Sequence, residues 1–339
     1  MRAKGISYDT EFVRDGSYSR KLFDPEVVER ELRIIRDELH CTAVRIMGGD
    51  PDRIELAAGY AAGLGLEVRF SPYPLERTAE EMLRLFADCA GRSERLRLGG
   101  AEVVFVAGAE LGLMNPWFLP GDTTEERIAL LARPEAVREH LGAVRGKVNA
   151  FLGEAVATVR EHFHGRLTYA AVPLEQVDWT PFDVVSLDLY RSAGTADRFA
   201  DGVRELTAQG KPVAVTEFGS ATYRGAGDRG ALGLSVVEYG PDGPVRLDGS
   251  YQRDEPGQAA HLRELLTAFD AGGIDAAFVF TFALHDFVHR PDGDPREDLD
   301  LASYGIVKVH EDRPGSTFPG LPWEPKEAFA AVGEYYRTH

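Results

Sequence analysis

Two glutamates follow short apolar runs, where a folded chain could bring their carboxyl groups together. Residues 103–109 read Val-Val-Phe-Val-Ala-Gly-Ala and precede Glu110, and residues 212–216 read Pro-Val-Ala-Val-Thr and precede Glu217. An apolar run without alternation is typical of a strand that is buried on both faces of a parallel sheet. In a (β/α)8 barrel the carboxyl ends of such strands form the catalytic face. Two carboxyl groups that converge there favour glycosidase chemistry.

The separation of the two carboxyl groups decides which glycosidase chemistry they can perform. A retaining enzyme holds them about 5–5.5 Å apart, one as general acid/base and the other as nucleophile. The ends of a fourth and a seventh strand lie across a barrel mouth, which favours such a pair. Either residue alone could instead cap a turn or pair with an arginine. We interpret Glu110 and Glu217 together as the candidate catalytic residues.

The rest of the chain alternates between strand-like runs and amphipathic segments, which predicts one (β/α)8 TIM barrel. The expected strands are residues 4–8, 41–47, 66–71, 102–107, 167–172, 182–190, 212–217 and 276–282. The expected helices are residues 25–39, 51–63, 78–98, 134–163, 196–210, 256–271 and 324–336. The connection after the fifth strand is too short for a full helix. No linker, internal repeat or low-complexity tract interrupts the pattern, so residues 1–339 are expected to form a single domain.

Long irregular segments are expected at only one end of this barrel. They are residues 112–133 after strand four, 220–255 after strand seven and 284–323 after strand eight. All three connect a strand to the following helix, so they would gather at the catalytic face. This asymmetry predicts a deep site walled by loops.

Three polar side chains are expected beside the glutamates. Arg45 lies near the end of an otherwise apolar run, residues 42–46. An arginine inside a barrel must be paired, either with a catalytic carboxylate or in a structural ion pair. Tyr190 ends the sixth strand, where its phenol could bind a carboxylate or pack in the core. Alternation along the same strand allows Asp188 to face the lumen, so all three are candidate substrate-site residues.

The insertion after strand seven begins with a glycine-rich segment, residues 222–230. Its glycines would let it fold tightly beside Glu217, with Tyr223 and Arg224 as candidate substrate contacts; a surface turn is the alternative interpretation. It is not a dinucleotide-binding fingerprint, because no helix opens directly after the glycines.

The other two insertions add Trp117 and His285 to the candidate substrate contacts. His285, Asp286 and His289 are residue types that ligate metals, and the acidic segment 292–300 could bind a cation. We interpret that segment as a solvated one and predict no metal. We also predict no cofactor. No phosphate-cradling glycine turn follows strand seven or eight, and no lysine ends a strand where a Schiff base would form.

Composition limits the possible partners. The net charge of −17 argues against nucleic acid or an anionic membrane as a partner, because both attract basic surfaces. The chain shows neither a signal peptide at its N-terminus nor an apolar run of the roughly 18–20 residues that span a bilayer, so a cytoplasmic location is expected. Cys41 lies at the head of a strand and Cys89 inside a helix, which argues against a disulfide. The sequence does not predict an oligomeric state.

These residues resemble the (β/α)8 glycoside hydrolases of the "4/7" superfamily. The likeness rests on the strand-four and strand-seven glutamates and on Thr-Glu-Phe-Gly at residues 216–219. It implies that Glu110 is the acid/base and Glu217 the nucleophile. The superfamily's strand-two arginine, strand-six aromatic and strand-eight aromatic match, by position, Arg45, Tyr190, and Phe280 or Phe282.

The chain is more closely similar to actinobacterial glycosidase-like proteins often labelled abortive-infection proteins. The shared segments are residues 4–10, 40–45, 216–219, 222–226 and 302–309. The label implies a role in phage defence but no particular chemistry.

One residue departs from the superfamily pattern. Its members usually carry asparagine before the acid/base, where it binds the sugar 2-hydroxyl, whereas this chain has Ala109. Hydrogen bonds to that hydroxyl strengthen in the transition state. We therefore expect a retaining glycosidase-like enzyme that acts on a small glycoside or glycosylated metabolite. The alternatives are a non-hydrolytic tailoring enzyme of a biosynthetic pathway and a ligand-binding barrel without hydrolase activity.

Overall fold

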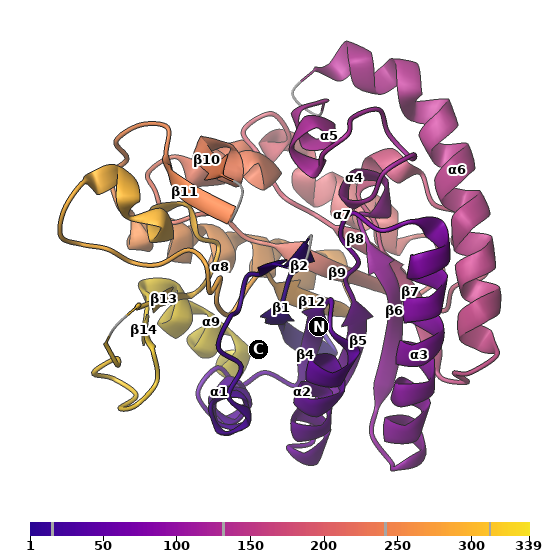
Figure 1. Ribbon diagram of the computed structural model, residues 1–339, viewed down its shortest axis with the longest axis horizontal. Helices are drawn as coiled ribbons and strands as arrows, with labels where there is room; N and C mark the ends of the chain where they lie inside the picture. Colours follow the sequence, from indigo (N-terminus) through magenta and orange to yellow (C-terminus); the bar gives the residue numbers. More distant parts are fainter. Residues whose placement is uncertain (15–16, 131–132, 241–242, 312) are drawn as a thin grey trace.

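Eight parallel strands form the barrel in the computed structural model, which describes residues 1–14, 17–130, 133–240, 243–311 and 313–339 (Figure 1). Their order around the sheet is β7-β6-β5-β4-β1-β12-β9-β8, and a parallel bridge between Ala171 and Leu187 joins β7 to β8. The strands are β1 (Ala3–Glu11), β4 (Ala43–Gly48), β5 (Glu67–Pro72), β6 (Val103–Ala109), β7 (Arg166–Ala170), β8 (Val185–Asp188), β9 (Val213–Phe218) and β12 (Ala276–Val279). The predicted (β/α)8 barrel is confirmed.

Helices surround the barrel at the predicted places. They are α1 (Pro25–Asp37), α2 (Pro51–Gly63), α3 (Ala79–Leu98), α6 (Pro134–Arg160), α7 (Phe199–Thr207), α8 (Glu255–Gly272) and α9 (Glu327–Thr338). Local sequence explains several starts. Asp24 and Asp50 each cap a helix whose next residue is proline, and Thr78 forms a capping box with Glu81.

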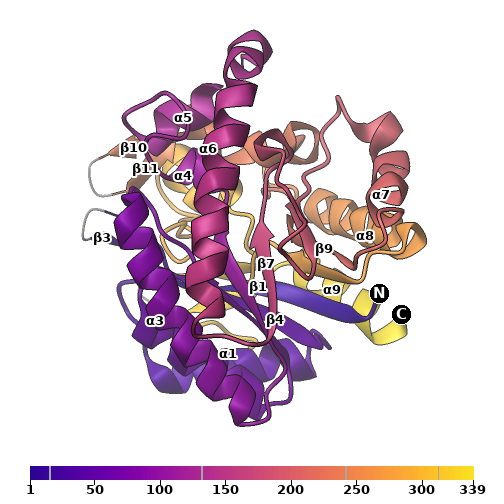
Figure 2. The same cartoon turned by 90° about the vertical axis from the view of Figure 1, so that its right-hand side faces the viewer.

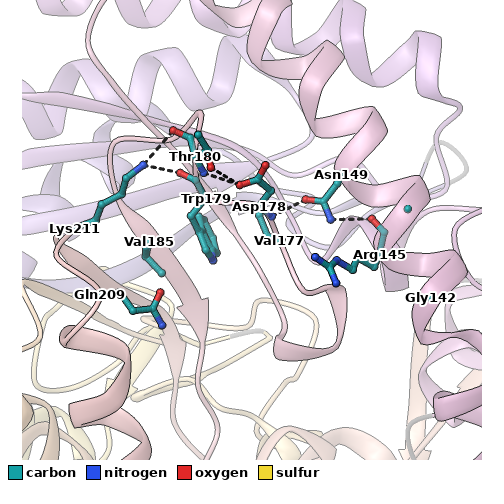
Figure 3. Close-up of a pocket in the computed structure, with 11 residues that line it drawn as sticks. Gly142, Arg145, Asn149, Val177, Asp178, Trp179, Thr180, Val185, Gln209 and Lys211 are labelled. Carbon is teal, nitrogen blue, oxygen red and sulfur yellow. Dashed lines mark hydrogen bonds between the residues drawn. The ribbon is translucent and has the colours of Figure 1, made fainter.

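The connection from β7 to β8 has no full helix. Residues 171–184, all of which the structure describes, contain one short turn, η1 (Pro173–Glu175). The space beside α6 is a cavity of about 720 Å³ on the outside of the barrel (Figure 3). Lys211 Nζ holds the connection in place by donating to the carbonyl oxygens of Trp179 and Phe182, each at 2.7 Å. The ring of helices is therefore open at this seam.

The insertions are more regular than the sequence suggests. After β6 the chain forms α4 (Leu111–Met114) and α5 (Thr124–Leu130) where an irregular segment is predicted. The remaining inserted elements are β2 (Val13–Arg14), β3 (Ser17–Tyr18), η2 (Ala196–Arg198), η3 (Ala226–Val236), β10 (Val237–Gly240), β11 (Gly243–Leu247), η4 (Pro295–Glu297), η5 (Leu299–Ala302), β13 (Val307–Val309) and β14 (Trp323–Pro325). Figure 1 shows α4, α5, β10 and β11 together at one end of the barrel. Residues 131–132, 241–242 and 312 of the predicted insertions lie outside the described residues.

Buried ion pairs hold two insertions together. Lys326 Nζ lies 2.9 Å from Asp300 Oδ1, and Arg253 Nη1 lies 2.7 Å from Asp300 Oδ2. Asp300 belongs to the insertion after β12, and Arg253 to the insertion after β9. This shared carboxylate fixes the two insertions relative to each other on the rim.

The floor of the barrel combines apolar residues with a buried ion pair, in which Arg69 of β5 lies over the Phe278 ring and 2.9 Å from Glu67. Six floor residues pack together, namely Ala3, Ala43, Val184, Ala214, Ala276 and Phe278. Gly5 is required there, because a β-carbon at this position would lie 2.3 Å from the Phe278 ring. Farther up the lumen, Arg45 of β4 pairs in register with Ser7 of β1 and contacts Ser71 of β5. A second set of polar groups therefore lies above the floor, near the carboxyl ends of the strands.

Two further predictions concern the cysteines and the membrane. Cys41 and Cys89 are both buried and unbridged, as expected. Among the described residues, no helix combines the length and the apolar character that crossing a membrane requires.

The N- and C-terminal segments lie side by side (Figure 2). Lys4 Nζ donates there to the Tyr336 carbonyl oxygen at 2.8 Å.

Candidate active site

Glu217, in β9, has both carboxylate oxygens engaged by side chains from other parts of the barrel, namely β4 and the segment after β8. Arg45 Nη1 donates to Oε1 at 2.7 Å, and the Tyr190 hydroxyl donates to Oε2 at 3.0 Å. Arg45 is fully buried and is held in turn by Ser71 Oγ at 3.1 Å from its Nε. A charge-assisted contact of this kind fixes the orientation of the carboxylate.

Glu110 follows β6 in a left-handed backbone conformation, with φ 45° and ψ 37°. A residue with a β-carbon rarely adopts this conformation, because it costs about 1–3 kcal/mol and persists only where the surrounding structure imposes it. Here the Glu110 N–H donates to the Ala170 carbonyl oxygen at 2.9 Å. The next two amides, of Leu111 and Gly112, donate to the Tyr169 hydroxyl and the Glu175 carboxylate, both at 2.8 Å. These bonds fix the turn that aims Glu110 at the mouth.

Three carboxylates meet at this mouth. Glu110, Asp188 and Glu217 each present an oxygen within 4.8 Å of an oxygen of the other two. Burial, and then the charges of Asp188 and Glu217, raise the pKa of Glu110 well above its ordinary value. Burial and the charge of Glu217 also raise the pKa of Asp188, against the opposing effect of Arg45. Glu110 or Asp188 is therefore suited to hold a proton, while Glu217 forms an ion pair with Arg45.

Asp9 is a rim residue that the sequence reasoning missed. β1 continues to Glu11 rather than ending at the predicted Tyr8, and Asp9 pairs in register with Met47. The register places Asp9 on the same face as Ser7, toward the lumen. Burial and the nearby charge of Glu11 raise the pKa of Asp9 well above its ordinary value. The signal available in the sequence was the alternation of the polar residues Ser7, Asp9 and Glu11 along β1.

Two aromatic residues complete the mouth. Met47, Tyr73, Val106, Ala109 and Ala170 form a small apolar cluster against which Phe280 packs. Burial and the charges of Glu110 and Glu217 raise the pKa of Tyr73, so its phenol stays neutral near the carboxylates. The sequence reasoning anticipated an aromatic residue at Phe280 but not Tyr73.

The two other aromatic candidates, Trp117 and Tyr223, have packing partners of their own. Trp117 is 41% exposed, stacks on Phe118 with ring centroids 4.1 Å apart, and meets Phe151 of α6 edge-on. Tyr223 is buried under its own insertion, where its hydroxyl donates to the Gly233 carbonyl oxygen at 3.1 Å. The structure therefore gives these two aromatics packing contacts within the insertions.

Arg224 and His285 are the two remaining candidate substrate contacts. The Arg224 side chain is exposed to solvent. Burial and the positive charge of Arg20 lower the pKa of His285 well below its ordinary value. His289 Nδ1 instead faces Asp298 Oδ1 at 2.9 Å. Of the two histidines considered as metal ligands, His289 is thus already engaged by a carboxylate.

The three carboxylates are themselves the group whose geometry could accept a metal ion. Their chemistry argues against it, because both oxygens of Glu217 already accept hydrogen bonds from Arg45 and Tyr190. A cation bound there would lie close to the positive charge of a guanidinium that is itself buried and bonded, and the two charges would repel each other.

Comparison with known proteins identifies the fold. The sequence matches no protein-family model and has no significant match among curated proteins. A GH113 β-1,4-mannanase structure aligns over 100% of this chain and 99% of its own, with a TM-score of 0.62 and 15% identity. The GH113 β-mannanase AaManA from Alicyclobacillus acidocaldarius, in complex with ManMIm, aligns over 99% and 97% with a TM-score of 0.57 and 15% identity.

A larger enzyme contains the same architecture. Bacteroides uniformis β-glucuronidase 2, covalently bound to cyclophellitol-6-carboxylate aziridine, aligns with 99% of this chain at a TM-score of 0.59 and 13% identity. The chain spans only 35% of that enzyme's length. The TM-scores establish a shared (β/α)8 fold. The low sequence identities do not establish a shared activity, which must be argued from the site.

Proposed function

We propose that this protein is a retaining glycoside hydrolase that acts on a small glycoside. The observation that carries the proposal is the pairing of Glu110 and Glu217, whose carboxylate oxygens lie within 4.8 Å of each other in different environments. Because one oxygen of each carboxylate meets this limit, the pair suits the retaining geometry, in which the carboxyl groups are about 5–5.5 Å apart. The fold neighbours, which are named as a mannanase and a glucuronidase, support the same reaction class.

Each glutamate has the environment that its role requires. Glu217, oriented by Arg45 and Tyr190, would attack the anomeric carbon. Glu110, whose pKa is raised by burial and by the neighbouring carboxylates, would pass its proton to the departing glycosidic oxygen. The bond to the aglycone breaks as an ester to Glu217 forms.

The second step reverses the roles. Glu110, now ionised, would take a proton from water while the water oxygen attacks the anomeric carbon. The ester breaks, the sugar leaves with its original anomeric configuration, and Glu217 regains its carboxylate. No other group is needed to balance these two steps.

Ala109 favours a second candidate function. This residue is buried in the apolar cluster with Met47, Tyr73 and Val106, so it offers no hydrogen bond to a sugar hydroxyl. A non-hydrolytic tailoring enzyme, or a barrel that binds a glycoside without cleaving it, would not need that bond. The same ligand class is expected in either case.

Covalent trapping tests the hydrolase directly. We expect activated 2-fluoroglycosides, or 5-fluoroglycosyl fluorides that keep the substituent at carbon 2, to add one glycosyl group to the peptide containing Glu217. Mass spectrometry would locate the adduct, Glu217→Gln should prevent it, and the exposed control Glu334→Gln should not. If gluco, manno and 2-amino-2-deoxy reagents all leave the protein unlabelled, or label another residue, the retaining mechanism is wrong.

A further inference from the structure

Asp188 is a buried carboxylate that the two-glutamate mechanism does not use. It is 3% exposed and reaches within 4.8 Å of the carboxylates of Glu110 and Glu217. The Thr216 hydroxyl is close enough to favour the charged form of Asp188. Even so, neither oxygen of Asp188 makes a hydrogen bond of normal geometry with any described residue. An unpartnered buried carboxylate costs free energy, so a structural role does not account for it.

Negative charge exceeds positive charge around Asp188. Arg45 is the cation that opposes the raised pKa of Asp188, but its guanidinium already binds Glu217 at 2.7 Å. The pair formed by Arg45 and Glu217 is close to neutral. Asp188 is therefore left to balance its charge with a proton or with a group that enters the site.

The same imbalance continues on the β1 side of the lumen. Asp9 is 2% exposed, and neither of its oxygens has a hydrogen-bond partner among the described residues. Arg20 influences Asp9 electrostatically, yet its Nη2 is paired with Glu31 Oε2 at 2.9 Å. Two unpartnered carboxylates thus face the lumen in addition to the glutamate pair.

We infer that the glycoside bound here carries a positively charged amino group beside its anomeric carbon, and that Asp188 binds this ammonium. The inference rests on the proposed function, because Glu217 and Glu110 must contact the anomeric carbon and its oxygen. A carboxylate within 4.8 Å of both can reach only the substituents next to that carbon. The substituent at carbon 2 is the one that varies there, so the substrate class is a 2-amino-2-deoxy glycoside.

Competing ligands fit the charges less well. A divalent metal ion takes several oxygen ligands, but both oxygens of Glu217 are engaged by Arg45 and Tyr190. A uronic acid, the glycone named for the glucuronidase neighbour, would bring a further negative charge to a site with surplus carboxylates. An ammonium offers three donors and one positive charge, which matches an unpartnered carboxylate.

Paired substrates test the inference. We expect 4-nitrophenyl 2-amino-2-deoxy glycosides, in the gluco or manno configuration, to show a kcat/KM at least about tenfold above their 2-hydroxy counterparts at neutral pH, from one charge-assisted bond. Asp188→Asn should reduce this ratio to near one, and N-acetylation of the substrate should do the same. Asp197→Asn, which removes an exposed carboxylate elsewhere, should leave the ratio unchanged.

A binding measurement separates this inference from the proposed function. Non-hydrolysable phenyl 1-thioglycosides of the same pairs would be titrated by calorimetry into wild type and Asp188→Asn. Preference for the amino thioglycoside that depends on Asp188, without turnover of any substrate, would support the inference and contradict the hydrolase. Turnover of neutral glycosides with no amino preference would overturn the inference alone.

The remaining outcomes also overturn it. Equal binding of the amino and hydroxy thioglycosides, or binding of neither, would show that Asp188 does not bind an ammonium. Calorimetric binding of Ca²⁺, Mg²⁺ or Zn²⁺ that is lost in Asp188→Asn would assign the carboxylates to a metal ion.

Discussion

Arg45→Met should destabilise the folded protein by about 3–5 kcal/mol, the usual cost of removing one partner of a buried ion pair. Arg45 is fully buried, and its Nη1 lies 2.7 Å from Glu217 Oε1. Methionine retains much of the apolar stem but donates no hydrogen bond. The Glu217 carboxylate would then keep only the Tyr190 hydroxyl at 3.0 Å. Most of the cost comes from the buried charge left behind.

The double variant Arg45→Met/Glu217→Gln isolates that charge. With a neutral glutamine at position 217, only the hydrogen bonds of Arg45 are lost, about 1–3 kcal/mol in total. The second substitution should therefore restore about 2 kcal/mol of the free energy of unfolding. Urea unfolding followed by far-UV circular dichroism would give this energy for the wild type, both single variants and the double variant.

An exposed ion pair provides the matched control. Arg84 and Glu80 form an exposed pair on α3, so Arg84→Met should change the free energy of unfolding by about 0.5 kcal/mol or less. If the effects of Arg45→Met and Glu217→Gln add within about 0.5 kcal/mol, the two residues are not coupled. That result would refute the account of how Glu217 is held.

Three other predictions follow from the titratable groups. Glu110→Gln should lower kcat/KM about 10²–10⁴-fold on methyl glycosides but little on dinitrophenyl glycosides, whose leaving group needs no proton; equal losses would contradict the acid role. Wild-type activity should fall as pH rises through the raised pKa of Glu110, and this limb should vanish in Glu110→Gln. Asp9 has a raised pKa in the fold, so the folded state binds more protons and becomes less stable as pH rises above about 3.9. Asp9→Asn should therefore increase the free energy of unfolding in urea at pH 8 more than at pH 4, and an equal gain at both would argue against this assignment. Burial raises the pKa of Cys41 and Cys89, so a thiol reagent should label them only after unfolding, and rapid labelling of the native protein would show that they are accessible.

The meeting of Glu110 and Glu217 could be anticipated because all strands of a parallel barrel end at one rim. Apolar runs identified the strands, and the residue after each run was thereby placed at the mouth. The same reasoning located Arg45, whose burial in an apolar strand required a partner. Alternation along the sixth strand located Asp188. These inferences need only the period of a strand and the direction of the chain.

The insertions could not be predicted in this way. Tyr223 follows glycines that allow many conformations, and its buried place depends on a bond to Gly233 in η3. Gly233 is itself held by the Tyr304 hydroxyl from a different insertion. Contacts between segments so far apart in sequence leave no periodic signal. Asp9 was missed for a related reason, since β1 extends along β4 as far as Gly48 through pairing between strands.

The open seam in the helical ring also determines how the site can move. Glu110 follows β6 and Glu217 lies in β9, so the two strands between them are β7 and β8, which a single bridge joins. The distance on which the chemistry depends therefore crosses the joint with the fewest ladder bonds in the barrel. Local opening begins where such bonds are few. Opening at this joint would lengthen the distance between acid and nucleophile, so the activity depends on the few backbone bonds that hold β7 to β8.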